Sequence, residues 1–296
     1  AILAMSLIAA MPNLLDYLGK TATEQTINLH LVFNLALAVL ALPVIGPVNA
    51  ALERFMRADT SATQKLENLS ALDPKLIEQP QRGLDCAARE LLGMGQRIER
   101  MLAAIEPLYE TWDKAAAETI SNEDYIIKKM HLEIKLYLAN MGRKGLEEEL
   151  FRRSMDLALL SSSFESASDA IARVMLKLAK RLNAQNLYFS SNGRDEISAF
   201  SNRVQSNVQL ALNVMMTQDP DAARELVAAK EKVRQVEQKL QRSHIGRLRE
   251  GLSESIETSN IHQETLRALK QVNTAFSIVG HPILLKTGDL LDSRLS

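Results

Sequence analysis

Residues 82–109 read RGLDCAARELLGMGQRIERMLAAIEPLY, and this stretch decides the fold class. Its small and apolar side chains recur at alternating steps of four and three residues, at positions 84, 88, 91, 95, 98, 102, 105 and 109. This spacing is typical of a helix that packs along one seam against other helices. Pro107 is expected to kink or interrupt the helix near its end.

Helical periodicity continues to the end of the chain. Apolar side chains repeat at helical spacing over residues 127–141, 146–182, 197–215, 226–240 and 261–279. Ser121–Asp124 resembles a capping box for the second of these helices, and Asp219-Pro220 is a typical helix start. No useful length alternates with a period of two. We therefore predict an all-α fold with two tandem three-helix bundles, residues 81–189 and 190–285, and a tail, 286–296.

The N-terminal part has a different character. Residues 31–52 read LVFNLALAVLALPVIGPVNAAL and contain no Asp, Glu, Lys or Arg. As a helix this stretch is about 33 Å long, close to the roughly 30 Å of a bilayer core. Pro43 and Pro47 are better tolerated in a membrane helix than in a soluble one. A membrane span is therefore predicted, with a buried core helix of a soluble protein as the alternative.

Charges and the first residues refine this interpretation. Arg54 and Arg57 follow the apolar stretch and favour a cytoplasmic exit. Ala1–Met11 is apolar and does not begin with Met, so we expect the sequence to start inside an earlier membrane helix of a longer protein. Residues 1–56 are accordingly assigned to the end of a truncated transmembrane transport domain. Residues 57–80, which are polar and contain Pro74 and Pro80, are assigned to a linker.

Composition disfavours several function classes. The formal net charge of −1 and the aromatic content of 4% argue against nucleic acid as a partner. The single cysteine, Cys86, precludes an intrachain disulfide and is typical of a reducing compartment. The sequence contains no phosphate-binding loop of the Walker type and no nucleophile elbow, and no two histidines have metal-ligand spacing. We therefore expect no enzymatic activity.

Two polar residues stand near the apolar stretch. His30 and Asn34 are four residues apart, so a helix places both on one face. Polar side chains within a spanning helix usually face the protein interior or a water-filled path. A contact between membrane helices and a role in transport are equally compatible with this pair.

Two carboxylates in the helical part form a candidate metal site. Glu165 and Asp169 are four residues apart in the serine-rich run 161–169. On a helix such like charges repel each other unless a cation lies between them, and paired carboxylates bind hard cations or iron. From the residues alone a solvated helix edge is the favoured interpretation, because the spacing of two ligands does not identify a metal site. A metal-dependent enzyme that uses both residues is the third functional hypothesis.

Several segments resemble a known family. His30-Leu-Val-Phe33-Asn34, followed by the apolar helix with its prolines, resembles the late transmembrane part of sodium-dependent phosphate cotransporters. The helical remainder resembles the PhoU-like domain that is fused behind the membrane part in bacterial members. The resemblance is carried by SHIGRLREG at 243–251, SIETSNIH at 255–262 and LRALKQVN at 266–273.

The resemblance implies two three-helix bundles and carboxylate metal ligands on their third helices. Glu165 and Asp169 match that pattern in the first half, with Ser168 where the family often has Gly. Lys270 and Thr274 stand at the corresponding positions of the second half and cannot supply the same ligands.

The predicted function is therefore that of the C-terminal portion of a bacterial sodium-dependent phosphate cotransporter in the inner membrane, with a cytoplasmic regulatory domain. Membrane lipid, inorganic phosphate, sodium as coupling ion and a second copy of the chain are the expected partners. The alternative is a membrane-tethered PhoU-like signalling adaptor that transports nothing.

Overall fold

The computed structural model describes residues 20–21, 23–37, 39, 70–143 and 145–289. The chain divides into two compact units, 1–69 and 70–296. In the first unit, residues 23–37 form a helix. Most of the expected membrane span at 31–52 lies outside the described residues. Among the residues that are described, no helix has both the length and the apolar character needed to cross a bilayer, so the expected transmembrane region finds no support there.

The regular secondary structure of the second unit is entirely helical, with no strand in ranges 70–143 and 145–289. This agrees with the predicted all-α class. Its elements are η1 (Pro74–Glu78), α5 (Pro80–Ile105), η2 (Glu106–Tyr109), α6 (Lys114–Gly142), α7 (Glu148–Asp169), η3 (Ala170–Met175), α8 (Leu176–Ala184), α9 (Ser191–Thr217), α10 (Pro220–Arg249), α11 (Ser253–Glu257), α12 (Ser259–Ser277), η4 (Ile278–Gly280) and α13 (His281–Thr287).

Local sequence explains where the long helices begin. The Asp219 side chain accepts hydrogen bonds from the first turn of α10, and Pro220 occupies the first helical position, as expected. The predicted capping box at Ser121–Asp124 is wrong, because α6 already begins at Lys114 and carries these residues in its interior. Asp113 is the actual cap, accepting from the backbone N–H groups of Ala115 and Ala116.

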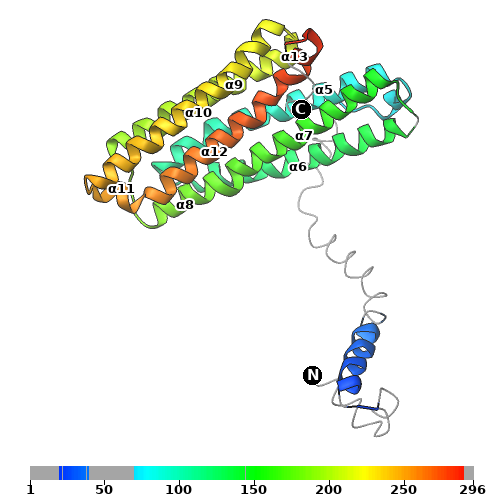
Figure 1. Ribbon diagram of the computed structural model, residues 1–296, viewed down its shortest axis with the longest axis horizontal. Helices are drawn as coiled ribbons and strands as arrows, with labels where there is room; N and C mark the ends of the chain where they lie inside the picture. The colour runs from blue at the N-terminus through cyan, green and yellow to red at the C-terminus, as the bar shows by residue number, and fades with distance from the viewer. Residues whose placement is uncertain (1–19, 22, 38, 40–69, 144, 290–296) are drawn as a thin grey trace. The chain divides into compact units, whose positions relative to one another are not determined.

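The long helices of the second unit run along one common direction (Figure 1). Helices α5, α6 and α7 pack against one another, and so do α9, α10 and α12. The two sets meet where α12 contacts α7 and η3 and where α5 contacts α9. We call residues 80–184 the first half and residues 191–287 the second half of the unit.

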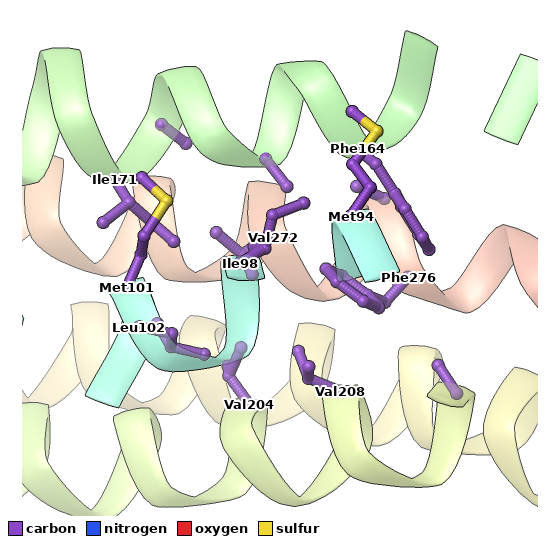
Figure 2. Close-up of a cluster of buried hydrophobic side chains, with 14 of the residues drawn as sticks. Met94, Ile98, Met101, Leu102, Phe164, Ile171, Val204, Val208, Val272 and Phe276 are labelled. Atoms are coloured by element: carbon purple, nitrogen blue, oxygen red, sulfur yellow. The ribbon is translucent and has the colours of Figure 1, made fainter. Parts of the chain in front are cut away.

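The apolar core is continuous across the two halves. Figure 2 shows side chains of α5, α7, α9 and α12 converging on one another. Phe164 of the first half stacks on Phe276 of the second, with ring centroids 4.4 Å apart. The helix of the predicted seam, α5, buries Met94 and Met101 as well as the seam residues Ile98 and Leu102, because it contacts both halves.

The third helix of the first half is not regular. The periodicity of residues 146–182 predicts one helix, but residues 170–175 form a π-helical turn between α7 and α8. Ala170, Ile171 and Met175 of this turn are buried, and the turn packs against α12. Such π turns are rare and often occur at functional sites. This one begins directly after Asp169.

Candidate functional site

A partly buried group of charges joins α6 to α7 beside the π turn. The ammonium of Lys128 on α6 forms an ion pair with Asp124, one helical turn earlier, and its Nζ lies 2.8 Å from Oδ1 of Asp169 on α7. Asp169 also pairs with Nε of Arg173, at 2.9 Å, within the π turn. Ser168, fully buried, donates its hydroxyl to Asp124 at 2.7 Å. Two carboxylates and two cations thus balance one another in this group.

The electrostatics of the group favour a charged lysine. Burial by itself lowers the pKa of the Lys128 ammonium, but hydrogen bonds and charge attraction from Asp124 and Asp169 outweigh it and raise the pKa above its ordinary value. The ammonium therefore stays protonated across the physiological range.

Glu165, the other predicted metal ligand, faces a different group. It lies half-buried one turn before Asp169, and its charge acts on His131 of α6. Nδ1 of His131 is 2.8 Å from the hydroxyl of Ser161. Burial and nearby Lys135 lower the pKa of His131, while Glu165 opposes that shift. Of the two predicted ligands, Asp169 thus pairs directly with a side chain of α6, whereas Glu165 acts on His131 of α6 through its charge.

The second half also joins its second and third helices through a lysine. Nζ of Lys270 on α12 donates to Oε2 of Glu237 on α10 at 3.0 Å. Glu237 has only 4% of its side chain exposed and accepts a second bond from Gln241 at 2.6 Å. Thr274, the other residue at a family metal position, donates its hydroxyl to the backbone carbonyl of Lys270.

A shallow groove lies between the two third helices. It has a volume of about 460 Å³ and is lined by side chains of α7, α12 and η4: Ser162, Ser163, Ser166, Arg267, Lys270, Gln271, Thr274, Ala275 and Ile278. Gln271 bridges the two halves by donating to the Ser166 hydroxyl at 2.9 Å. The groove places Lys270 beside the serine-rich run of α7.

A separate polar cluster, largely buried, lies in the second half near α11. Arg247 donates to both oxygens of Glu196, at 2.8 and 2.7 Å. Above this pair the rings of His244 and His262 stack with centroids 4.7 Å apart. His244 Nε2 lies 2.8 Å from the Ser259 hydroxyl. Both imidazoles are 1% exposed, and each has a buried Nδ1 without a hydrogen-bond partner.

The cluster shifts the pKa values of its members. Burial lowers the pKa of His244 to about 4, helped by the neighbouring His262 and Arg247. Burial would raise the pKa of Glu196, but His262 and the hydrogen bonds from Arg247 and Ser243 outweigh it and hold that pKa at about 2. The Arg247–Glu196 pair is therefore ionised at neutral pH, whereas His244 is neutral.

The first unit carries the other two predicted site residues. His30 and Asn34 lie on the helix of residues 23–37, one turn apart, and both side chains are exposed. The expected shared face is thus present, and a role in transport stays a prediction.

Comparisons with known proteins agree with this geometry. The model of the PhoU domain matches residues 91–177. A protein of Salmonella typhimurium named "Putative inorganic phosphate export protein YjbB" is 27% identical over 286 residues, which cover 96% of this chain and 52% of the relative. The protein of the same name from Escherichia coli K12 is 28% identical over 92% of this chain and 50% of its own length. The chain thus spans about half the length of these relatives.

Two solved structures have a similar arrangement of helices. PhoU from Pseudomonas aeruginosa superimposes with a TM-score of 0.63 at 18% identity, covering 70% of this chain and 98% of that protein. The phosphate transport system regulatory protein PhoU from Streptococcus pneumoniae gives 0.62 at 19% identity, covering 72% and 100%. The helical unit has the PhoU fold.

The residues at the PhoU-like metal positions do not fit a divalent cation as they stand. Among the residues that the structure describes, no three His, Cys, Asp or Glu side chains are placed to hold a metal ion together. The Asp169 carboxylate is already shared between Lys128 and Arg173. In the second half Lys270 brings its own positive charge to the position.

Sequence reasoning missed the partners of the predicted residues. Asp124 and Lys128 have the spacing of a helical ion pair, and that signal was readable. Their contact with Asp169, and the contact of His244 with His262, join residues far apart in the sequence. No local pattern predicts such contacts.

Proposed function

We propose that this chain is the C-terminal portion of a bacterial inner-membrane phosphate transporter, and that its PhoU-like helical unit regulates the transport domain from the cytoplasmic side. The observation that carries the proposal is the combination of the PhoU fold with a relative, aligned along 96% of the chain, whose name is that of a phosphate export protein. The relatives are about twice as long, which leaves room for a larger transport domain.

The apolar stretch supplies the membrane part of the proposal. Residues 31–52 cross the bilayer, in contact with lipid, and Arg54 and Arg57 keep the following chain in the cytoplasm. His30 and Asn34 face the interior of the transport domain, where phosphate moves with sodium as the coupling ion.

Phosphate flux by the longer protein tests this function. Cells that lack other phosphate transporters would carry the protein, and radiolabelled phosphate would be followed in both directions with and without a sodium gradient. We expect flux that depends on the protein and on sodium. Phosphate flux that does not depend on sodium would show that sodium is not the coupling ion. A membrane-bound protein that carries no phosphate flux would favour the signalling adaptor.

Substitution of the polar pair tests its role separately. His30→Ala and Asn34→Ala should each reduce phosphate flux at least several-fold while the protein remains in the membrane, because each removes a polar group from the proposed path. Asn28→Ala, on the opposite side of the same helix, is the matched control. Equal flux in all three variants would contradict the role of His30 and Asn34.

A further inference from the structure

We propose that the ammonium groups of Lys128 and Lys270 take the place of a bound metal ion in the first and second half, respectively. In each half the second and third helices are then held together without a divalent metal ion. The proposal goes beyond the proposed function and does not depend on it. It concerns the positions where the PhoU-like pattern implies metal, which in this chain are occupied by ammonium groups.

In the first half the ammonium has the position that a shared cation would take. Lys128 lies between the carboxylates of Asp124 and Asp169, which come from two different helices. Asp124 is 12% exposed and Asp169 31% exposed, so their charges need a nearby cation more than surface carboxylates do. Lys128 supplies the charge: it donates a hydrogen bond to Asp124 on its own helix and forms an ion pair with Asp169 on α7.

In the second half the same connection is made with the roles of the helices exchanged. The carboxylate, Glu237, is on the second helix and the lysine is on the third. Glu237 is almost fully buried, and Lys270 is the cation that neutralises it. Two solutions that differ in detail but share a lysine indicate that a fixed ammonium is the general device of this unit.

A divalent ion would compete poorly with these lysines. Mg²⁺ and Mn²⁺ require several oxygen ligands around them. Here Asp124 and Glu237 already accept hydrogen bonds from lysine ammonium groups, and Asp169 is paired with Lys128 and Arg173. A bound metal ion would also lie close to an ammonium, and like charges a few ångströms apart repel strongly inside a protein.

The purified protein tests the first consequence. Its metal content would be measured by elemental mass spectrometry, and its thermal midpoint with EDTA and with millimolar Mn²⁺ or Mg²⁺. We expect less than one bound metal ion per several chains and a midpoint that neither treatment changes. A stoichiometric metal ion, or a midpoint that falls in EDTA, would overturn the proposal.

Substituting the lysines tests the second consequence. Lys128→Met leaves Asp124 without its cation and Asp169 with Arg173 alone, so we expect the thermal midpoint to fall by roughly 5 °C or more and Mn²⁺ to restore at least half of the loss. Lys270→Met should lower the midpoint less, because Lys270 is 40% exposed. Lys114→Met removes an exposed lysine from the same helix as Lys128 and should change neither the midpoint nor the response to metal.

Two further outcomes decide the interpretation. Lys128→Arg keeps the positive charge, so it should fold and remain indifferent to Mn²⁺ even where Lys128→Met does not fold. A metal response of Lys128→Arg in the absence of one in Lys128→Met would contradict the assignment. A folded Lys128→Met variant whose midpoint Mn²⁺ leaves unchanged would likewise show that the two carboxylates do not form a cation position.

Discussion

The two halves of the helical unit connect their first and second helices by the same chemistry at different depths. In the first half Arg97 of α5 pairs with Glu123 of α6 through one contact of 2.8 Å, and the side chains are 19% and 20% exposed. In the second half Arg247 of α10 binds both oxygens of Glu196 of α9, and the arginine is 6% exposed. The arginine is thus more deeply buried in the second half, whereas the two glutamates are similarly exposed, at 20% and 17%.

We expect the burial of the arginine and its bidentate contact, rather than the mere presence of an ion pair, to determine how much each half depends on the pair. A partly exposed pair contributes little, because water solvates either partner when the other is removed. A buried partner left alone retains the full cost of desolvation. The buried pair also supports the stacked rings of His244 and His262, for which the first half has no counterpart among its described residues.

Removing the arginine of the buried pair should give the largest effect. Arg247→Leu leaves the Glu196 carboxylate without its bidentate partner, and we expect the free energy of unfolding to fall by about 3 kcal/mol. Denaturant unfolding of the purified protein measures this change.

The matched variant in the first half is Arg97→Leu, which should cost about 1 kcal/mol or less because its pair is partly exposed. The double variant Arg247→Leu, Glu196→Leu should recover part of the loss. Equal costs for the two single arginine variants would break the contrast between the halves.

Acid should weaken the second half more than the first. The pKa of His244 is about 4 in the folded protein, against an ordinary value of 6.5, so the unfolded chain binds more protons between these values. Stability from the neutral imidazole is therefore fully present above pH 6.5 and is lost as the pH falls toward 4. We expect a loss of at most about 3 kcal/mol, since one pKa unit corresponds to about 1.4 kcal/mol.

Denaturant unfolding at a series of pH values measures this slope. His244→Gln should remove most of the loss between pH 6.5 and 4. His131→Gln, in the first half, should leave most of it in place, because the His131 ring is only partly buried. An unchanged slope in His244→Gln would assign the acid sensitivity to another group.

The all-α fold could be predicted from the sequence because packed helices require apolar residues at a regular spacing. The seam of residues 84–109 predicted the buried face of α5, and Leu91, Ile98 and Ile105 are fully buried. The predicted seam covered only part of the buried face of α5, since Met94 and Met101 are buried as well. A heptad pattern describes contact with one neighbouring surface, whereas α5 contacts helices of both halves.

The candidate site was less readable. Glu165 and Asp169 were singled out as two like charges one turn apart, and that spacing is correct. What neutralises Asp169 lies on another helix, about forty residues earlier. The π turn after Asp169 contains no glycine or proline that would mark it in the sequence, and it packs against α12, which comes much later in the chain. Long-range contacts of this kind are specified by the folded arrangement and not by any local pattern.

Substitution of two glycines of α5 by alanine compares the packing between the halves with the packing inside the first half. These substitutions should give the smallest change in stability. A Cβ atom at Gly95 would lie 2.6 Å from Cδ2 of Leu212 in the second half and 3.1 Å from Cε2 of Phe164. At Gly93 the nearest atom is Cε of Met130, at an ordinary 3.8 Å. Gly95→Ala should therefore destabilise the protein by about 1 kcal/mol, because overpacking exceeds the gain in helix propensity. Gly93→Ala should stabilise it by up to about 1 kcal/mol, since only the propensity gain remains.

Denaturant midpoints that shift in opposite directions would show that the halves are packed against each other more tightly than α5 is against α6. A stabilising Gly95→Ala would mean that Leu212 moves aside at little cost, and that the contact between the halves is the looser one.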